Sequence, residues 1–278
     1  MIRILTDSTC DLPQTLLDSY HIGVVPLRIH IGNQVKLDGA EITPAQIFAH
    51  TDATGELCTT SSPNIGEFLL RFQEDSPRAN AVICITIGAG FSSCYQNACI
   101  AAEEFSNIYV VDSQSLSSGQ GLVVLEAGRL AQEGKPLAAI LQALQDLIPR
   151  VDASFILGRL DYMRKGGRCS SVASLGANLL NIKPCIQVRD GSMVMGRKYR
   201  GPLDKVMYAY TRDRLSSCPL AGGTAIIVYP REERTAIEAA RRALAEDGRF
   251  DTILEADAGG TVACHCGPGT IGVMFAAS

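Results

Sequence analysis

Hydroxyl side chains follow several predicted strands and open the helices that come next. Thr60 and Ser61 lie in a hydroxyl-rich segment, residues 59–63, and Ser92 opens a predicted helix after an apolar strand. A serine hydroxyl and the free amides at a helix start both donate hydrogen bonds to an anion. Because such loops meet at the carboxyl ends of the strands in a parallel sheet, we expect them to converge. The pattern predicts a pocket that holds a buried carboxylate, although the residues alone do not distinguish a fatty acid from a sugar or a small acid.

Residues 160–184 form a second stretch with the character of an anion site. Gly166-Gly167 predicts a turn that places Arg168 just before Ser170-Ser171, and an apolar run at helical spacing follows. Serines can cap that helix, and a helix start beside a fixed guanidinium favours an anion. The simpler alternative is a glycine turn, a capped core helix and two solvated cations.

A dinucleotide site is a competing hypothesis. Gly88-Ala89-Gly90 follows a strand and opens a helix, and Asp112 ends the next strand at about the distance expected for an acid that binds a ribose. However, Ser93 replaces the third glycine of that fingerprint, and the sequence contains no Walker-type phosphate loop.

A metal site is the other competing hypothesis. Cys264-His265-Cys266 offers thiolate and imidazole ligands of the kind that zinc binds. Ligands one residue apart rarely chelate the same ion, and no second pair at metal-ligand spacing accompanies them. We therefore interpret His265, beside Gly267-Pro268-Gly269, as a rigidly held imidazole that donates or accepts hydrogen bonds, and we expect neither a metal nor a cofactor.

The alternation of strands and helices predicts an α/β fold. Residues 81–87 are continuously apolar, which is typical of a strand buried on both faces of a parallel sheet. Composition changes around residues 149–152, so we expect a three-layer α/β/α domain with a parallel sheet at residues 1–152. Residues 153–278 then form an α/β domain with a mixed sheet, because they combine a predicted hairpin at Asp190-Gly191 with strand–helix units. The ligand site is expected between the two domains.

Other elements can be assigned from the apolar periodicity. Further predicted strands cover residues 2–5, 24–31, 107–111, 154–157, 224–229, 251–255 and 272–275. Predicted helices cover residues 11–20, 118–132, 136–148, 202–215 and 232–246, and others begin near residues 43, 65 and 92. We expect residues 59–63 and the cysteine-histidine segment to be loops.

Composition excludes several classes of protein. The chain has 278 residues, 46% of them hydrophobic, so a sizeable core can form. The net charge of −4 argues against a nucleic-acid partner, which usually meets a basic face. No apolar run is long enough for a membrane span, so we expect no stable membrane insertion. The N-terminus becomes polar after five residues, unlike a secretory signal, so we expect a cytoplasmic protein with mostly reduced cysteines.

The motifs of this chain resemble those of the DegV family from one end to the other. The matching motifs are Thr6-Asp7-Ser8, Asp11-Leu12-Pro13, Val25-Pro26-Leu27, Thr60-Ser61-Ser62-Pro63, residues 91–96, Val111-Asp112-Ser113, Gly119-Gln120-Gly121, residues 164–168, residues 181–184, Arg200-Gly201, and His265 with Gly267-Pro268-Gly269. The resemblance implies a two-domain α/β protein that encloses one long-chain fatty acid between its domains. It also implies the fatty-acid-binding subunit of a bacterial fatty acid kinase, which presents the carboxylate to a separate ATP-binding subunit.

The resemblance assigns roles to individual residues of the pocket. It places Thr60 or Ser61, together with Ser92, on the carboxylate, and it places His265 over the head group. Asp7-Ser8 would line the site from the first strand.

The resemblance also implies a partner surface, and the chain departs from the family pattern in places. Arg168 and Arg200 stand at basic positions that would meet the kinase subunit or the incoming phosphate. Ser93-Cys94, Ser62 and Gly88-Ala89 replace the usual Gly-Thr, Gln and Ser-Ser. These substitutions lie beside the head group or upper tail, so they bear on chain-length preference and on the ligand itself.

We expect a binding protein rather than an enzyme. The sequence shows no nucleotide loop, no paired carboxylates at a site and no nucleophile–base pair. The alternative is a self-sufficient kinase or hydrolase that acts on a small acid in the same cleft. A fatty acid that copurifies with the protein would separate the two hypotheses.

Overall fold

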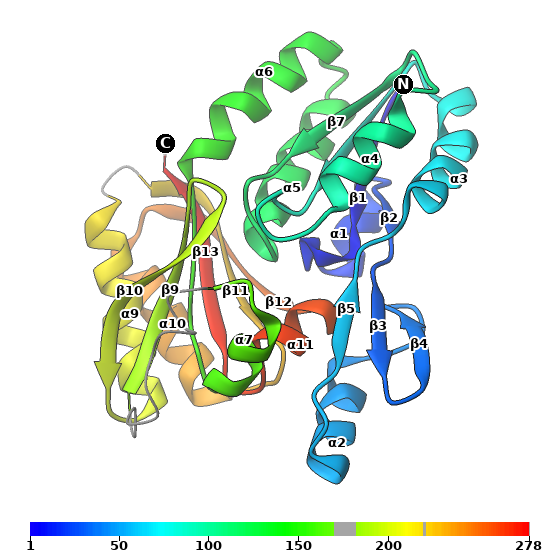
Figure 1. Ribbon diagram of the computed structural model, residues 1–278. Coiled ribbons are helices and arrows are strands. Elements are labelled where there is room, and N and C mark those ends of the chain that lie inside the picture. Colours follow the sequence, from blue (N-terminus) through cyan, green and yellow to red (C-terminus); the bar gives the residue numbers. More distant parts are fainter. Residues whose placement is uncertain (170–181, 219–220, 278) are drawn as a thin grey trace.

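A parallel sheet and a mixed sheet organise the computed structural model, which describes residues 1–169, 182–218 and 221–277 (Figure 1). The predicted Ser170-Ser171 cap and the apolar helix after it lie outside the described residues. The two-domain α/β fold expected from the sequence is confirmed.

The parallel sheet belongs to the N-terminal half and forms the middle of three layers. Its strand order is β2 (Gly23–Val25), β1 (Ile2–Asp7), β6 (Ala81–Thr86) and β7 (Ile108–Asp112). The helices around it are α1 (Gln14–Ser19), α3 (Ile65–Asp75), α4 (Cys94–Ala102), α5 (Ser118–Gln132) and α6 (Leu137–Leu147). Alternate side chains of β1 and β6 pack on α3 and α4 on one face, and on α5 on the other. Each residue of β6 is buried, as the predicted apolar run requires.

The mixed sheet belongs to the C-terminal half. Its strand order is β10 (Ser192–Arg200), β9 (Ile182–Arg189), β8 (Val151–Ile156), β13 (Ile271–Ala277), β11 (Ala221–Tyr229) and β12 (Phe250–Asp257). Strands β11 and β12 pair in parallel, and the other neighbours are antiparallel. Helices α9 (Leu203–Ser217) and α10 (Arg234–Asp247) cover one face of the sheet. The predicted hairpin forms at Asp190-Gly191, where both residues have positive φ.

Helix α5 lies between the two sheets and serves the core of both (Figure 1). Two glycines allow its close approach, because a Cβ on Gly121 would lie 2.7 Å from the Cys10 carbonyl oxygen, and one on Gly119 would lie 2.9 Å from Cβ of Ala153. Gln120, between them, donates its side-chain amide to Thr6 Oγ1 at 2.9 Å and accepts from Thr9 Oγ1 at 2.9 Å. The motif Gly119-Gln120-Gly121 therefore joins the first strand to the second half of the chain.

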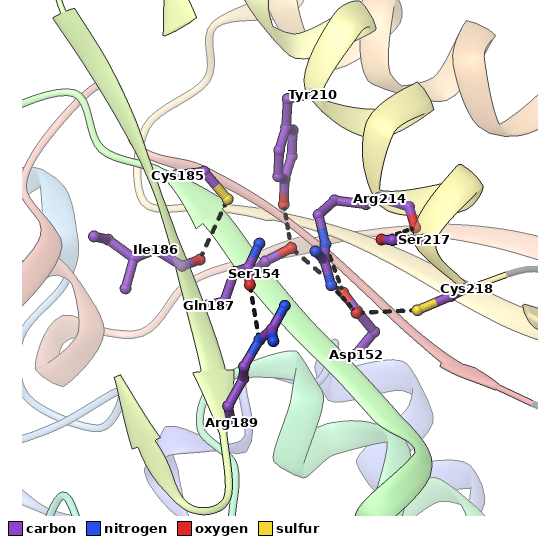
Figure 2. A network of polar contacts seen from close by, with 10 residues as sticks. All are labelled: Asp152, Ser154, Cys185, Ile186, Gln187, Arg189, Tyr210, Arg214, Ser217 and Cys218. Carbon is purple, nitrogen blue, oxygen red and sulfur yellow. Dashed lines mark hydrogen bonds and ion pairs between the residues drawn. The ribbon is translucent and has the colours of Figure 1, made fainter. Parts of the chain in front are cut away.

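A polar network joins β8 to α9 inside the C-terminal half, and Figure 2 shows its members. Arg214 makes a two-pronged ion pair with Asp152, and the Cys218 thiol also donates to Asp152 at 3.3 Å. The hydroxyl of Tyr210 lies 2.8 Å from Ser154 Oγ in the buried interior. The burial of these polar groups is tolerated because each of them has a partner.

A small antiparallel sheet of order β4 (Gln34–Leu37), β3 (Arg28–Ile31) and β5 (Thr59–Ser61) was not expected. Pro26 divides the single strand predicted at residues 24–31, because a proline cannot donate to a strand ladder. The hydroxyl-rich segment predicted as a loop forms β5 instead, and helix α2 (Pro44–Thr54) connects β4 to it.

Two short helices were also missed by sequence reasoning. Helix α7 (Leu160–Gly166) extends into the predicted Gly166-Gly167 turn, and Gly167 ends it with a left-handed φ of 68°. Helix α11 (Gly260–Cys266) contains the cysteine-histidine segment that was predicted as a loop. The described residues also contain the 3-10 turns η1 (Ser8–Cys10), η2 (Ser76–Arg78) and η3 (Ile148–Arg150).

Two buried acidic side chains from the N-terminal half hold the start of α11. Asp38 accepts from the backbone amides of Gly260 at 2.8 Å and Thr261 at 3.1 Å, and Asp11 accepts from the amide of Gly259 at 2.7 Å. These amides have no partner within the helix, so the acidic side chains satisfy donors that would otherwise be left unpaired. Helix α11 thereby leaves the C-terminal sheet and packs on α2, β3 and β5.

The pKa of Asp11 generates a prediction about stability. Burial raises the pKa of this carboxyl from 3.8 to about 8, so the folded protein keeps a proton there that the unfolded chain releases near pH 4. Stability should therefore fall as the pH rises from about 4 to about 8 and level off above that. Asp11→Asn keeps the shape and can still contact Gly259 and Ser117, but it cannot ionise. Thermal melting across this range should show a flatter pH dependence for Asp11→Asn than for the wild type, and parallel curves would contradict the assignment.

Candidate functional site: a cavity with a polar rim between the two halves

A cavity of about 290 Å³ lies where the two halves meet. Its walls come from η1, β5, the loop between β6 and α4, β10 and α11. The polar part of the wall includes Thr60, Ser61, Ser92, Thr261, His265 and Arg168. The apolar part includes Leu27, Ile87, Phe91, Leu116, Met193 and Val262. The cavity therefore has the amphipathic lining expected for a ligand with one polar end and one apolar end.

Strand β5 and helix α11 bring Thr60 and His265 together, although 205 positions separate them in the sequence. Thr60 Oγ1 lies 2.7 Å from His265 Nε2, and β5 is held by pairing with β3. Ser61 lies next to Thr60 and is 2.9 Å from His30 Nε2. The predicted convergence of Thr60, Ser61 and His265 is what the structure shows around this cavity.

Ser92 reaches the same cavity from the start of α4. Its hydroxyl oxygen accepts from the Cys94 amide at 3.3 Å, and its hydroxyl group lies 3.1 Å from the Cys94 sulfur. Ser93, the next residue, lies 2.7 Å from Ser62 across the rim. The β6–α4 loop and the residue that follows β5 are therefore linked by a contact between two hydroxyls.

His265 is an uncharged donor or acceptor at neutral pH. Burial, with a smaller contribution from the Arg168 guanidinium, lowers its pKa from 6.5 to about 4. Its Nδ1 faces Gly166, where an added Cβ would lie 2.4 Å away. Nδ1 is buried and has no hydrogen-bond partner among the described residues. The ring therefore supplies polarity without charge.

Arg168 supplies positive charge to this rim. Its Nη1 donates to the Gly166 carbonyl at 2.6 Å and its Nε to the Phe91 carbonyl at 3.4 Å, which ties the guanidinium to both halves of the chain. The side chain remains exposed while lining the cavity. The predicted position on a partner surface thus coincides with the cavity mouth.

Asp7 and Ser8 do not line this cavity, contrary to the expectation from the sequence. Asp7 is fully buried and accepts from the amides of Thr9 and Ile87 at 3.0 and 2.7 Å, and burial raises its pKa. Ser8 donates to Asp38 at 3.0 Å and accepts from Leu27 at 3.0 Å. Both side chains therefore hold the segments beside the cavity in place. In this segment it is Thr9 that lines the cavity.

Arg200 also lies away from the cavity. It ends β10, opposite Ile182, whereas Met193 near the start of the same strand lines the cavity. Seven residues of extended strand separate the two positions by about 20 Å. The structure therefore brings Thr60, Ser61, Ser92, His265 and Arg168 together and leaves Arg200 apart.

Thr261 is a candidate that sequence reasoning missed. It lies in the first turn of α11 and lines the cavity, and its Oγ1 is buried without a hydrogen-bond partner among the described residues. An unpaired buried hydroxyl is costly unless a ligand or water satisfies it. The only signal in the sequence was a hydroxyl residue after Gly259-Gly260. It does not indicate a site unless a helix is known to begin at that point.

The structure also bears on the dinucleotide and metal hypotheses. Asp112, the expected ribose acid, accepts from the amides of Ala89 and Gln114 at 3.1 and 2.9 Å, so it holds the loops around it. In the part of the chain that the structure describes, no group of three or more histidine, cysteine, aspartate or glutamate side chains could hold a metal ion. Within the same residues, no helix has both the length and the apolarity to cross a membrane.

Comparison with known proteins identifies the family. The family model described as "Uncharacterised protein, DegV family" matches residues 1–278. The chain belongs to the DegV family. A DegV domain-containing protein of Clostridium acetobutylicum is 32% identical over 276 residues, which cover 99% of this chain and 98% of that protein.

Solved structures of DegV proteins share the fold. A structure described as "Fatty Acid Binding of a DegV family Protein from Thermus thermophilus" has 30% identity and a TM-score of 0.93, covering 100% of this chain and 99% of that one. A stearic acid-binding protein from Eubacterium ventriosum has 25% identity and a TM-score of 0.88, covering 100% of this chain and 98% of that one. DegV proteins of this fold thus include structures described as binding fatty acids.

The positive charge of Arg168 should have a measurable effect on the pKa of the His265 imidazole. Arg168→Gln should raise the pKa of the imidazole from about 4, because a nearby positive charge disfavours protonation. Arg200→Gln is the matched control, since Arg200 lies far along β10. NMR titration of the ring resonances gives both values. An equal effect of the two substitutions would show that Arg168 does not face the ring.

Proposed function

We propose that this DegV protein encloses one long-chain fatty acid, with its carboxylate at the polar rim and its chain in the apolar interior between the two halves. The observation that carries the proposal is that Thr60, Ser92, His265 and Arg168 line one cavity together with apolar side chains from both halves of the chain. The relatives from Thermus thermophilus and Eubacterium ventriosum, described as binding fatty acids, support the same ligand class.

The polar rim suits a carboxylate. Hydroxyl groups of Thr60, Ser92 and Thr261 can each donate one hydrogen bond, and Arg168 contributes the positive charge that a neutral His265 does not. Arg168 therefore acts first on the bound carboxylate, from its place on the cavity wall. Ser61 is the alternative hydroxyl on β5, and its contact with His30 makes Thr60 the better candidate.

The apolar interior suits a long chain. Leu27, Ile87, Phe91 and Leu116 line the cavity and belong to a buried cluster that spans both halves. The same cluster continues through Phe155, Met163 and Ile186, with Met193, Met195 and Val262 packed against it. Each buried methylene contributes about 0.8 kcal/mol, so a chain of some fourteen methylenes contributes roughly 11 kcal/mol before ordering costs. The polar side chains at the rim then serve mainly to orient the carboxylate, because most of the binding free energy comes from the chain.

The further role that we propose is presentation of the carboxylate to a separate ATP-dependent kinase subunit in the cytoplasm. The chain is then a binding subunit and the partner makes the acyl phosphate. The position of Arg168 at the cavity mouth supports this role, because an exposed guanidinium beside the carboxylate can stabilise charge on a transferring phosphoryl group. Arg200, remote from the cavity, is assigned to the surface that contacts the partner.

The experiment that tests the ligand class is mass spectrometry of lipid extracted from the purified protein. One fatty acid per chain is the expected result. Purified protein without lipid, but with ATP turnover in the presence of a small acid, would favour a self-sufficient kinase. Hydrolysis of an ester or amide without ATP would favour a hydrolase.

Removal of a rim hydroxyl should weaken binding of the fatty acid. Ser92→Ala and Thr60→Val each remove one hydrogen bond to a charged group, which costs about 1.5–3 kcal/mol, or roughly tenfold to a hundredfold in Kd. Ser216→Ala is the control, because that serine caps nothing near the cavity and bonds the Arg212 carbonyl on α9. Displacement of a fluorescent fatty acid measures Kd. Unchanged affinity in both rim variants would remove these hydroxyls from the site.

The two arginines should separate binding from transfer. Arg168→Ala should weaken fatty acid binding and abolish acyl-phosphate formation, because its guanidinium lines the cavity. Arg200→Ala should keep the lipid and the melting temperature and lose only coupling to the kinase subunit. The assay measures acyl phosphate after addition of the kinase subunit and ATP to lipid-loaded protein. Normal coupling in Arg200→Ala would exclude Arg200 from the partner surface.

A further inference from the structure

Two thiols lie together directly behind the polar rim. Cys58 precedes β5 and Cys264 lies in α11, and both line a second cavity of about 40 Å³ that also reaches Thr60 and His265. Both are buried in one apolar cluster with Ile29, Ile47 and Phe48. Strand β5, which directly follows Cys58, and helix α11, which carries Cys264, are the pair that brings Thr60 to His265, and they lie next to each other in Figure 1.

The two thiols differ in reactivity. A hydrogen bond from the Cys264 thiol lowers the pKa of Cys58, and the nearby Lys165 ammonium lowers it further, although burial acts in the opposite direction. Lys165 Nζ is fixed beside Cys58 by donating to the Leu57 carbonyl at 2.9 Å. The hydrogen bond to Cys58, followed by burial, raises the pKa of Cys264. The Lys165 ammonium, which is held beside Cys58 and lines the same small cavity, favours the thiolate of Cys58. We therefore assign Cys58 as the nucleophile and Cys264 as the thiol that attacks it in the second step.

The small cavity gives a peroxide access to Cys58. A volume of about 10–15 Å³ holds one water, so a space of about 40 Å³ admits a molecule of two oxygen atoms. Lys165 and Arg168 both line this space and can stabilise the hydroxide that leaves when the O–O bond breaks. Burial raises the pKa of two cysteines on the core strands, Cys84 and Cys185.

We propose that Cys58 and Cys264 form a peroxide-sensitive pair whose disulfide locks β5 to α11 and so closes the rim of the lipid cavity. The Cys58 thiolate attacks one oxygen of hydrogen peroxide, which gives a sulfenic acid at Cys58 and hydroxide, and the hydroxide takes up a proton to become water. The Cys264 sulfur then attacks the Cys58 sulfur. The S–O bond breaks and the departing hydroxide takes the Cys264 proton. Two thiols are oxidised by two electrons, and one peroxide is reduced to two waters.

The consequence for lipid exchange rests on the proposed function, whereas the chemistry of the thiols does not. A covalent bond between the residue before β5 and the neighbour of His265 prevents separation of these two walls. A fatty acid already inside should leave more slowly, and an empty cavity should fill more slowly. Reduction by dithiothreitol should restore both rates, since a thiol can exchange with the disulfide.

The first test is peptide mapping of the native wild-type protein after treatment with hydrogen peroxide. The expected product is one peptide pair that joins Cys58 to Cys264, with the loss of two hydrogens, and it should disappear with dithiothreitol. Cys264→Ser should instead leave a sulfenic acid at Cys58 that dimedone traps. Cys99→Ser is the control, because this partly exposed cysteine on α4 lies outside the pair and should leave the product unchanged. Both thiols remaining free, or Cys58 joined to a different cysteine, would overturn the proposal.

The second test measures release of a fluorescent fatty acid from oxidised and reduced protein. Release should slow on oxidation in the wild type and in Cys99→Ser, and it should not change in Cys58→Ser. A mapped disulfide with unchanged release would reject the closing of the rim. A mapped disulfide in a protein that binds no fatty acid at all would instead reject the proposed ligand and leave the thiol chemistry established.

Discussion

The candidate site depends on the capture of a helix start by acidic side chains from the other half of the chain. Helix α11 is only seven residues long and is too short to be stable by itself. Asp38 and Asp11 bind its first amides, and this contact places Thr261, Val262 and His265 on the cavity wall. Without that contact the C-terminal half would contribute neither the imidazole nor the hydroxyl opposite β5. The buried acidic side chains are thus the connection between the fold and the site.

Sequence patterns predicted the parts of the fold that local physics decides. The continuous apolar run of β6 and the Asp190-Gly191 turn each specify one structure, and the structure has both. The alternation of strands and helices sufficed for the two-domain α/β class. Ser92 follows β6 and lies at the carboxyl edge of the parallel sheet, as the general rule predicts. Thr60 reaches the same cavity from β5 of the small antiparallel sheet, to which that rule does not apply.

What could not be predicted depends on contacts between distant segments. Helix α11 has no apolar period or capping residue of its own, since its cap is provided by Asp38, 222 positions earlier. Strand β5 has three residues and exists because β3 pairs with it. The family resemblance led us to expect Asp7 in the pocket, but its carboxyl group accepts hydrogen bonds from Gln120 and from the amides of Thr9 and Ile87. Residue type indicated polarity in each case, and only tertiary packing determined which polar groups face the cavity.

The capture of α11 also imposes an order on synthesis. The carboxylate of Asp38 leaves the ribosome 222 residues before the amide of Gly260 that it binds. At about 5–20 residues per second, that interval lasts on the order of ten to forty seconds. During this time the nascent N-terminal half displays two acidic side chains and an open wall at β5. The cavity cannot close around any guest until translation has passed residue 265, so the proposed capture of a lipid requires a chain whose second half has already been made.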